Sequence, residues 1–416
     1  ELDMTSGFTV LTGETGAGKS ILIDALQLAL GARADAGVVR EGASRCEICA
    51  EFDAPPATHH WLQDAGFDTE SSLLLRRTID ATGKSRAFIN GSPATATQLR
   101  ELGDLLLDIG SNDSTTLRAY PADRYQLVGM DPTGTKFARY YPPHVALIPD
   151  FFNAPAFQSR FPGRRAKIIT SFAMFYDLEN PQEFMREIVQ VLDPEGIWVF
   201  EQSYLPSMLS QLAYDTICHE HLEYYALRQI EFMTSRNGLK VIDVELNDTN
   251  GGSFCVTVAH QGSRHQPNER ALGALRESEA RLGLDAAPIY ESFRMLVERH
   301  RDELRRFVRR ETAAGKSFYG YGASTKGNVL LQYCGFTADD IRAIAEVNEE
   351  KFGRYTPQSH IPILSESDVR ARRPDYMLVL PWHFRTGIVA REQAYLNAGG
   401  RLVFPLPHLD VVAAGD

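Results

Sequence analysis

The sequence predicts an α/β protein of three lobes, and three observations lead to this prediction. A glycine-rich loop at residues 13–20 stands between a β-rich run and a helix of apolar periodicity. From residue 105, short apolar strands alternate with helices, which is typical of a mostly parallel sheet. A second series of strands and helices begins at residue 317. The lobes are expected at residues 1–104, 105–262 and 263–416.

The composition is that of an acidic globular protein. The 416 residues carry a formal net charge of −11, so a broad surface for nucleic acid or for an anionic membrane is not expected. No apolar run has the length of a membrane span, and five scattered cysteines do not form a disulfide framework, so we expect a cytoplasmic protein with reduced thiols. Cys46 and Cys49 lack the second ligand pair that structural zinc requires, so no metal site is predicted. The oligomeric state stays open.

The glycine-rich loop has the spacing of a phosphate-binding P-loop. Its glycines, which let backbone amides surround a phosphate, are Gly13, Gly16 and Gly18. Lys19 would neutralise the terminal phosphates of ATP, and Ser20 would bind magnesium. Hydrolysis also needs an acid that holds the metal and a group that positions water. No apolar strand ends in an Asp-Glu pair suited to this role, so the loop is a candidate site for ATP and magnesium, and whether it hydrolyses ATP stays open.

The chain around this loop alternates strands with helices. Besides the β-rich run at 7–11 and the helix at 21–30, it has a predicted hairpin of strands 73–79 and 85–89, and a helix at 96–102. Residues 7–108, including the P-loop and the segment Leu75-Arg76-Arg77-Thr78-Ile79, resemble the N-terminal ATPase lobe of the RecN DNA-repair family. The resemblance implies a partial P-loop NTPase lobe that holds ATP and magnesium without a complete active site.

The two following lobes are predicted from their strands and helices. Strands of the middle lobe are expected at 105–109, 125–130, 146–149, 166–170, 196–201, 238–246 and 252–259. Residues 181–192 read as a helix, 261–269 as a linker, and 271–314 as one or two long helices. Strands of the last lobe are expected at 317–321, 341–347, 376–380 and 401–404.

The first strand of the middle lobe ends in an acidic residue and a glycine turn, as in the first crossover of nucleotide-binding sheets. The residues of this pattern are Asp108, Gly110, Asn112 and Asp113. Asp131 ends the next strand, where a carboxylate either accepts hydrogen bonds from ribose hydroxyls or caps a loop. After the third strand, Asp150 and the aromatic pair Phe151 and Phe152 either hold an adenine or form an edge of the core.

Four segments of the chain resemble the sugar C-methyltransferases, which methylate a ring carbon of nucleotide-linked deoxysugars in deoxysugar biosynthesis. The segments are residues 108–113, 171–178, 217–225 and 320–328. The resemblance implies a Rossmann-like class I methyltransferase sheet and a second, C-terminal Rossmann-like α/β lobe that binds the substrate. It also implies S-adenosylmethionine as the methyl donor, with Ser171 and Phe172 in its site, and a small nucleotide-linked keto sugar as the acceptor.

Methylation of a ring carbon requires a base, because the carbon must lose a proton to form an enolate. His219, Glu220 and His221 supply two imidazoles and a carboxylate. The resemblance implies that His221 is the base and that Glu220 orients it. From the residues alone, the cluster equally fits a metal site or a solvated loop. The tyrosines that would donate to the ketone oxygen, or would belong to the core, are Tyr176, Tyr224 and Tyr225.

Two glycine-containing segments are candidates for contact with the nucleotide-linked sugar. The first, which also fits a plain hairpin turn, contains Asn250, Gly251, Gly252 and Ser253. The second follows a strand and opens a helix, and its candidate residues are Gly322, Ala323, Lys326 and Asn328. Trp382 and His383 are expected to line the same cleft or to belong to the core.

Two departures keep other functions in consideration. Position 114 is Ser where the resemblance leads us to expect a third small, glycine-type residue, which would crowd the donor. The family also begins with a cysteine-rich zinc module, whereas this chain carries the RecN-like segment, which indicates a fusion at a shared strand near residues 105–110. The alternatives are therefore an ATP-binding DNA-repair fragment and a catalytically inactive chimeric binding module.

Overall fold

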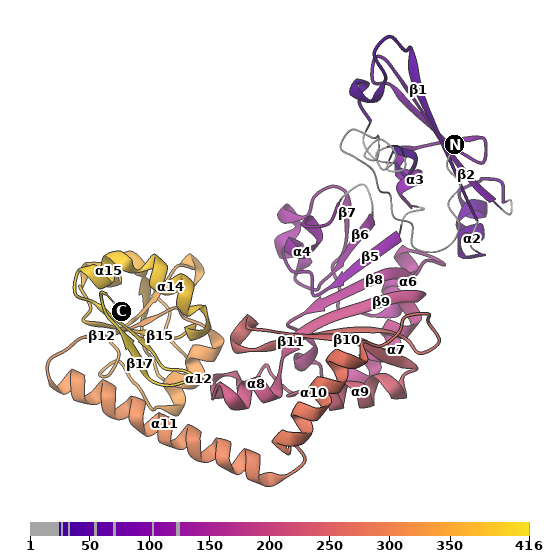
Figure 1. Cartoon of the computed structure of the whole chain (residues 1–416). Coiled ribbons are helices and arrows are strands. Elements are labelled where there is room, and N and C mark those ends of the chain that lie inside the picture. The colour runs from indigo at the N-terminus through magenta and orange to yellow at the C-terminus, as the bar shows by residue number, and fades with distance from the viewer. Residues whose placement is uncertain are drawn as a thin grey trace. The chain divides into compact units, whose positions relative to one another are not determined.

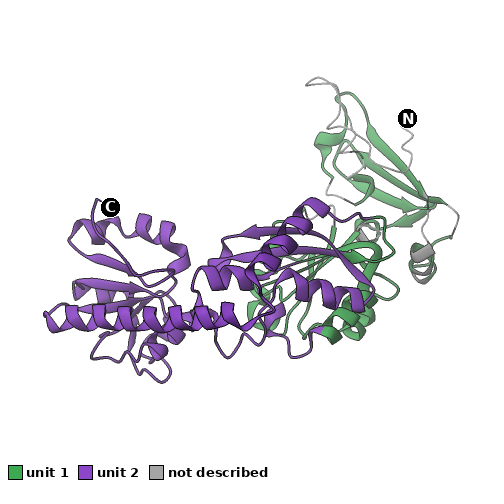
Figure 2. Ribbon diagram, turned by 60° about the horizontal axis from the view of Figure 1, so that its bottom comes forward, with its two compact units in different colours: residues 1–172, 182–199, 259–264 green, residues 173–181, 200–258, 265–416 purple. Residues whose placement is uncertain are grey.

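The computed structural model describes residues 25, 28–31, 34–53, 56–69, 72–101, 104–121 and 125–415. The chain divides into two compact units, coloured green and purple in Figure 2. Unit 1 contains residues 1–172, 182–199 and 259–264, and unit 2 contains residues 173–181, 200–258 and 265–416. The predicted P-loop, together with the strand expected before it, lies outside the described residues.

The N-terminal part of unit 1 contains a four-stranded antiparallel sheet (Figure 1). Its strands, in order, are β1 (Arg45–Asp53), β2 (Ser72–Asp80), β3 (Ser85–Ile89) and β4 (Ser92–Ala94). The predicted hairpin is confirmed: β2 and β3 pair antiparallel, and the Asp80 carboxylate accepts the Lys84 amide at 3.0 Å across the turn. Alternate residues of β2, including Leu73 and Leu75, pack with Leu62 and Leu99 from α2 (Pro56–Asp64) and α3 (Ala96–Glu101).

The second sheet has seven strands in the order β10-β11-β9-β8-β5-β6-β7 (Figure 1). The strands are β5 (Asp104–Ile109), β6 (Tyr125–Met130), β7 (Val145–Ile148), β8 (Ala166–Phe172), β9 (Leu192–Ser203), β10 (Leu239–Asn247) and β11 (Ser253–His260). Strand β5 pairs in parallel with both β6 and β8, and its apolar residues are buried on both faces. The order of the strands therefore reverses beside β5.

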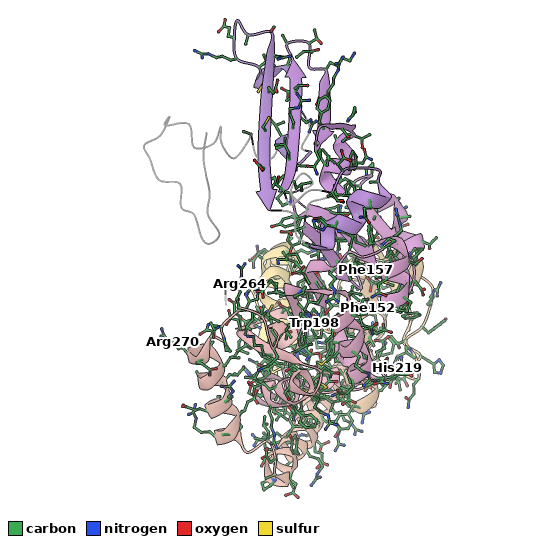
Figure 3. All side chains as sticks on the ribbon, turned by 90° about the vertical axis from the view of Figure 1, so that its right-hand side faces the viewer. Phe152, Phe157, Trp198, His219, Arg264 and Arg270 are labelled. Carbon is green, nitrogen blue, oxygen red and sulfur yellow. The ribbon has the colours of Figure 1, made fainter. Side chains whose placement is uncertain are left out.

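Short helices and long helices accompany these strands. They are α4 (Thr115–Arg118), α5 (Gly134–Phe137), α6 (Ala154–Arg160), α7 (Pro181–Val191), α8 (Leu205–Ser210), α9 (Leu227–Arg236) and α10 (Glu269–Leu282). The long helix α11 (Ala287–Ala313) instead buries Val297, Leu304 and Val308 in the C-terminal core of unit 2. Helix α7 buries Phe184, Met185, Ile188 and Val191, which recur at helical spacing. The fully buried Trp198 of β9 packs against Phe184, with ring centroids 5.9 Å apart, and is labelled with Phe157 in Figure 3.

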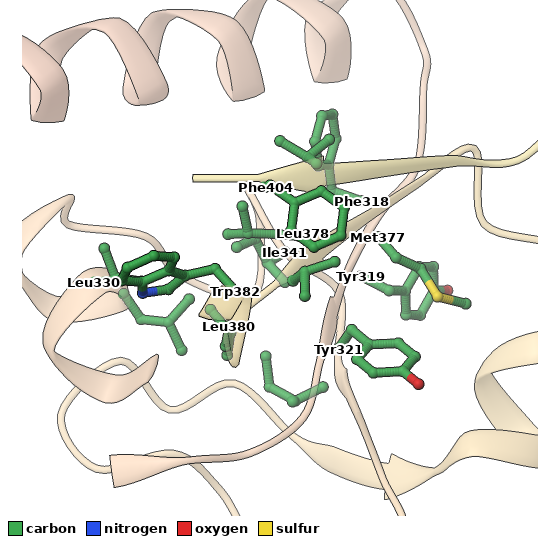
Figure 4. Packing of buried hydrophobic residues seen from close by; sticks show 14 of the residues in the cluster. Phe318, Tyr319, Tyr321, Leu330, Ile341, Met377, Leu378, Leu380, Trp382 and Phe404 are labelled. Atoms are coloured by element: carbon green, nitrogen blue, oxygen red, sulfur yellow. The ribbon is translucent and has the colours of Figure 1, made fainter. Parts of the chain in front are cut away.

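The C-terminal part of unit 2 is a second α/β sheet, in the order β14-β13-β12-β15-β16-β17. Its strands are β12 (Phe318–Tyr321), β13 (Ile344–Glu346), β14 (Ile363–Ser365), β15 (Tyr376–Val379), β16 (Arg401–Phe404) and β17 (Asp410–Val412). Its helices are α12 (Thr325–Tyr333), α13 (Glu366–Ala371), α14 (Arg385–Arg391) and α15 (Gln393–Asn397). The core in Figure 4 includes Phe318, whose ring stacks on Tyr376 at 4.6 Å.

The fold class predicted from the sequence is confirmed. The strands expected at 125–130 and 401–404 match β6 and β16 residue for residue, and the region 271–314 forms two helices, α10 and α11. The three-residue strands β4, β14 and β17 were not expected, because so few residues show no periodicity. In the described part of the chain, no helix is both long and apolar enough to cross a membrane.

Candidate active site

Each parallel sheet has a point where the order of its strands reverses, and crevices at the carboxyl ends of strands form there. In unit 1 this point lies at β5, between β6 and β8, and in unit 2 it lies at β12, between β13 and β15. The predicted donor residues follow or end β5 to β8: Asp108, Gly110, Asn112, Asp113, Asp131, Asp150, Phe151, Ser171 and Phe172. They therefore share one edge of the sheet.

The loop after β5, which we call the donor loop (residues 110–114), is fixed by the end of β6. Gly110 has a positive φ of 71°, and its amide donates to the Met130 carbonyl at 2.9 Å. The Asp131 carboxylate accepts the Asn112 amide at 2.9 Å through one oxygen. Its other oxygen accepts the amide and the hydroxyl of Thr133, each at 2.6 Å. Asp131 thus holds the donor loop and keeps lone pairs for a further donor.

The donor loop also contains backbone strain. Asn112 and Ser114 have φ values of 46° and 60°, in the left-handed region that favours glycine. Ser114 is fully buried, and its hydroxyl donates to the Tyr140 carbonyl at 3.1 Å. The Tyr141 hydroxyl donates to the Asn112 carbonyl at 3.0 Å. Such strain persists where surrounding contacts enforce it, and it concentrates at functional sites.

Asp108 is a buried acid beneath the donor loop. The Thr170 hydroxyl, from β8, donates to its carboxylate at 2.6 Å. Burial raises the pKa of Asp108 to about 7, although the Thr170 hydrogen bond opposes this rise and the Asp131 charge adds to it. The site therefore contains an acid that changes its charge near neutral pH, next to a second carboxylate. This is an environment that favours a cationic ligand.

The residues at the ends of β7 and β8 differ in accessibility. Phe151 is 73% exposed, and its amide donates to the Asp150 carboxylate at 2.8 Å. Ser171 is buried, and its hydroxyl accepts the indole N–H of Trp198 at 3.0 Å, so its side chain is occupied in packing. Phe172 is partly exposed. An exposed aromatic face is therefore present at Phe151, beside the carboxylate of Asp150.

The histidine cluster belongs to unit 2, where it lies against Tyr176 of the short helix η3 (Phe175–Asp177). The Tyr176 carbonyl accepts the amides of Leu222 and Glu223 at 3.0 and 3.1 Å. The rings of His221 and Tyr176 are 4.3 Å apart. The side chain of His219, labelled in Figure 3, is 84% exposed and lies 3.9 Å from the Glu220 carboxylate. The fold therefore brings His221 and Tyr176 together and leaves His219 outside.

His221 is half-buried, and its surroundings disfavour the imidazolium. Burial lowers the pKa of His221, and the charge of Lys326 lowers it further, while a hydrogen bond with the Thr216 backbone and the Glu220 charge raise it. Because the ordinary pKa of His lies near 6.5, a lowered pKa leaves the ring neutral at pH 7. A neutral imidazole can accept a proton.

The two remaining tyrosine candidates differ in their partners. The Tyr224 hydroxyl donates to the Thr216 carbonyl at 3.4 Å, which ties it to the segment before the histidines. Tyr225 is buried, and its ring lies 5.4 Å from the ring of Phe175. Within the described residues, the Tyr225 hydroxyl has no hydrogen-bond partner. A buried hydroxyl of this kind is available to a ligand or a water.

The glycine segment before β11 permits a close approach that side chains would prevent. Gly251 and Gly252 have φ values of 90° and 118°. A Cβ atom on Gly251 would lie 3.0 Å from the Trp382 ring, and one on Gly252 would lie 2.4 Å from Ser207. The Asn250 carbonyl accepts the Lys326 ammonium at 3.0 Å. The Ser253 hydroxyl donates to the Thr249 carbonyl at 2.9 Å, so this segment has a fixed conformation.

The loop after β12, which we call the α12 loop (residues 322–326), repeats the construction of the donor loop. Gly322 has a φ of 80°, and its amide donates to the Ala345 carbonyl at 2.8 Å. The Glu346 carboxylate accepts the Ala323 amide at 2.9 Å. Asn328 lies half-buried on α12, one turn after the first residue of the helix. The predicted substrate residues of this loop thus lie at the reversal point of the second sheet.

A buried polar cluster next to Lys326 was only partly predicted from the sequence: Trp382 and His383 were candidates, and Asp215 was not. Asp215 is completely buried and accepts the indole N–H of Trp382 at 2.8 Å, and the Lys326 charge opposes the rise in its pKa that burial causes. Burial, aided by the Lys326 charge, lowers the pKa of His383 to about 4. Among the described residues, Asp215 Oδ1 and His383 Nδ1 lack a partner. The sequence signal for Asp215 was its place just before the histidines.

Comparisons with known proteins match two families to most of the chain after residue 85. Residues 86–244 match a methyltransferase-domain family, and residues 248–407 match the family of the C-methyltransferase C-terminal domain. The chain is 31% identical to the C-methyltransferase NovU of Streptomyces niveus over 313 residues, which are 75% of this chain and 74% of NovU. The plantazolicin methyltransferase BpumL, solved with SAH, is 13% identical at a TM-score of 0.31, over 38% of this chain and 76% of that chain.

The N-terminal segment has different relatives. Residues 1–70 match an AAA domain family. The chain is 41% identical to the DNA repair protein RecN of Haemophilus influenzae over 133 residues, which are 31% of this chain. It spans only 24% of the length of that relative. Both resemblances predicted from the sequence are therefore confirmed.

The parallel sheet with acidic strand ends, together with the methyltransferase-domain match over residues 86–244, defines a methyltransferase that uses S-adenosylmethionine. The extended match with NovU then shows that the chain belongs to the C-methyltransferase family. The donor loop suits this cofactor chemically, since Asp131 can accept hydrogen bonds from hydroxyls and the buried Asp108 can balance a positive charge.

Proposed function

We propose that this chain methylates a ring carbon of a nucleotide-linked keto-deoxysugar in the cytoplasm. The observation that carries the proposal is the placement of the half-buried His221 beside the Tyr176 ring, where burial and the charge of Lys326 lower the pKa of its imidazole. In this proposal residues 105–262 form the donor-binding lobe and residues 263–416 the substrate lobe. The relationship to NovU supports the reaction class, while the sugar is our inference.

The first step is the removal of a proton from the ring carbon beside the ketone. His221 accepts this proton, and the electron pair of the C–H bond moves toward the ketone oxygen to give an enolate. Burial raises the pKa of Tyr176, so its hydroxyl stays protonated and can donate to that oxygen. The charge of Glu220, the residue just before His221, favours the imidazolium that forms.

The second step is methylation of the enolate carbon. S-Adenosylmethionine, when bound, would supply an electrophilic methyl group, whose bond to sulfur would break as the new carbon–carbon bond forms, with S-adenosylhomocysteine as the leaving group. The residues that would hold this cofactor are those of the donor loop with Asp108 and Asp131. In the substrate lobe, Lys326 and the amides of the α12 loop would bind the diphosphate. The α12 loop and the 250–253 segment would position the sugar so that its ring carbon lies toward His221, which belongs to the same unit.

His221→Gln tests the proposed base. The probe is thymidine diphosphate-4-keto-6-deoxyglucose, whose carbon beside the ketone exchanges with solvent deuterium when a base acts on it. We expect the variant to slow exchange and methyl transfer by about 10²–10⁴-fold, with unchanged affinity for S-adenosylmethionine, because a general base contributes this much. The matched control is His408→Gln, an exposed histidine of the same unit. Full exchange in His221→Gln would refute the assignment.

The N-terminal lobe supports a second, limited proposal. Because the P-loop sequence is complete and residues 1–70 match an AAA domain family, we infer that this lobe binds ATP with magnesium. Calorimetric titration with ATP should give a signal that Lys19→Ala removes, with no turnover in either protein. Titration with S-adenosylmethionine alongside it identifies an inactive chimera by the absence of donor binding.

A further inference from the structure

We propose that a pocket along α12 holds the base of the substrate's nucleotide, an inference that rests on the proposed function. The pocket has a volume of about 510 Å³, within the range of sites for small organic ligands. It lies entirely in unit 2. The 250–253 segment and the α12 loop account for a sugar and a diphosphate, and no residue discussed above accounts for the base.

The residues that line the pocket adjoin both parts of the proposed substrate site along the chain. On one side it is lined by Cys218 and His219, which stand shortly before the proposed base His221. On the other side it is lined by Thr325, the first residue of α12, which precedes Lys326. A ligand with its sugar at His221 and its diphosphate at Lys326 would therefore direct its remaining part into this pocket.

One face of α12 supplies the wall of the pocket. Asn328, Val329, Gln332 and Tyr333 follow Thr325 at helical spacing and line it. From Lys326 to Tyr333 the helix rises by about 10 Å, which separates the two ends of an extended ligand. A diphosphate at the N-terminus of α12 would thus place a base against the middle and the end of the helix.

The chemistry of the wall suits a flat ring with a polar edge. Ile217 and Tyr333 line the pocket and are 50% and 38% exposed, so apolar surface is available for stacking. The amide of Asn328 has both a donor and an acceptor, as the edge of a nucleobase does. Such a site combines stacking with a few polar groups that fix orientation.

Contacts outside the pocket hold its wall in place. The Arg301 guanidinium lies 5.3 Å from the centre of the Tyr333 ring, and the Tyr214 ring lies 5.5 Å from it. The Gln332 side chain donates to the Pro357 carbonyl at 3.1 Å, which joins two lining residues. The pocket is therefore formed before a ligand enters, which reduces the entropy lost on binding.

The test compares two valines that line different pockets. Val329 and Val389 are both half-buried against the same hydrophobic core, and Val389 lines a separate pocket of about 370 Å³ at α14. The full-length variants Val329→Phe and Val389→Phe are titrated calorimetrically with thymidine diphosphate and uridine diphosphate. A Lys19→Ala background and EDTA suppress nucleotide binding by the P-loop. Tyr333→Leu, which removes stacking without filling the pocket, is the second variant.

We expect Val329→Phe and Tyr333→Leu to weaken nucleoside diphosphate binding by about tenfold to a hundredfold, as loss of base stacking does. Val389→Phe should bind like the parent protein, and all variants should bind S-adenosylmethionine equally. Equal nucleotide affinity in Val329→Phe and Val389→Phe, or no nucleotide binding by the parent, overturns the pocket assignment. Normal methyl transfer with unchanged KM in Val329→Phe also overturns it and leaves the proposed function intact. Pocket-dependent nucleotide binding without any methyl transfer sinks the proposed function alone.

Discussion

The donor loop of unit 1 and the α12 loop of unit 2 use the same backbone construction with opposite charge. In each, a glycine of positive φ follows a central strand, Gly110 or Gly322, and donates its amide to the last residues of the neighbouring strand. In each, the acid that ends this neighbouring strand, Asp131 or Glu346, accepts an amide of the loop at 2.9 Å. The sequence of a glycine turn and a distant acid therefore encodes one local structure twice.

The difference lies in the side chain beside each loop. Beneath the donor loop stands Asp108, a buried acid, whereas the α12 loop carries Lys326, a partly buried cation. A negative site favours the sulfonium of the methyl donor, and a positive site favours a diphosphate. In our proposal, one backbone design thus serves ligands of opposite sign, and the neighbouring charge selects between them.

The largest effect is expected from removing the acid of each loop. Asp131→Asn should weaken S-adenosylmethionine binding by about tenfold to a hundredfold, because charge-assisted hydrogen bonds to the loop and the ligand are lost. Glu346→Gln should weaken binding of thymidine diphosphate by a similar factor and leave the donor affinity unchanged. Calorimetry on both variants with both ligands checks this. If each variant weakened both ligands equally, the two loops would not serve separate ligands.

A second test removes the cation of the α12 loop. Lys326→Met should raise the pKa of His221, since the Lys326 charge now helps to lower it. The base acts only when neutral, so activity falls as pH drops through its pKa. The acidic limb of kcat/KM for deuterium exchange should therefore move to higher pH, by about half a unit to one unit.

Lys326→Arg is the control for this test, because it keeps the charge and changes the shape. Its acidic limb should stay where the parent protein has it, whatever the loss in kcat/KM. An unmoved limb in Lys326→Met would mean that another group, and not His221, titrates in the profile.

The sequence predicts a loop of this kind only where the residues that mark it lie close together in the chain. Strands β5 and β6 follow from apolar runs ended by Asp and Gly, and these signals lie within a few residues. Asp131 was predicted for this reason. Glu346, its counterpart, was missed because the short strand β13 shows too little pattern to mark its own end.

Contacts between distant segments of the chain are the second reason why the sequence did not predict the whole site. The buried Asp215 carboxylate accepts a hydrogen bond from the indole N–H of Trp382, which lies 167 residues further along the chain. The hydroxyl of Ser171 is used by Trp198, so its place in a predicted donor segment did not reveal its packing role. A neutral His221 likewise depends on burial and on Lys326, neither of which its neighbours in sequence indicate.

The charge beneath the donor loop gives a smaller, pH-dependent effect. With its pKa raised to about 7, Asp108 is largely protonated below that pH and ionised above it. A cationic ligand favours the ionised form, so S-adenosylmethionine should bind about tenfold more tightly at pH 8 than at pH 6. Asp108→Asn should remove this dependence, and Asp113→Asn should keep it, because a hydrogen bond from Thr115 lowers the pKa of Asp113.

The raised pKa of Asp108 also predicts how the stability of the unliganded protein depends on pH. Stability should fall as pH rises, whereas the affinity for S-adenosylmethionine should increase. Between the ordinary pKa of 3.8 and about 7, the folded state binds more protons at Asp108 than the unfolded state does. The contribution of this group to stability is therefore complete below the ordinary pKa and is lost as pH rises through about 7. Urea midpoints that fell equally with pH in the parent and in Asp108→Asn would contradict this.

The smallest effect concerns the residues with positive φ, where the two loops differ. The α12 loop uses glycine at this conformation, whereas the donor loop also places Ser114 there. Ser114→Gly should relieve about 1 kcal/mol of strain but lose the hydrogen bond to Tyr140, worth about 1 kcal/mol, so stability should change little. Ser114→Ala loses the bond and keeps the strain, and should be destabilised by about 1 kcal/mol.

Urea unfolding, followed by Trp198 fluorescence in a Trp61→Phe, Trp382→Phe background, separates the two contributions. Equal stability of the Gly and Ala variants would show that the left-handed conformation stores no strain, and that glycine at position 322 reflects space alone.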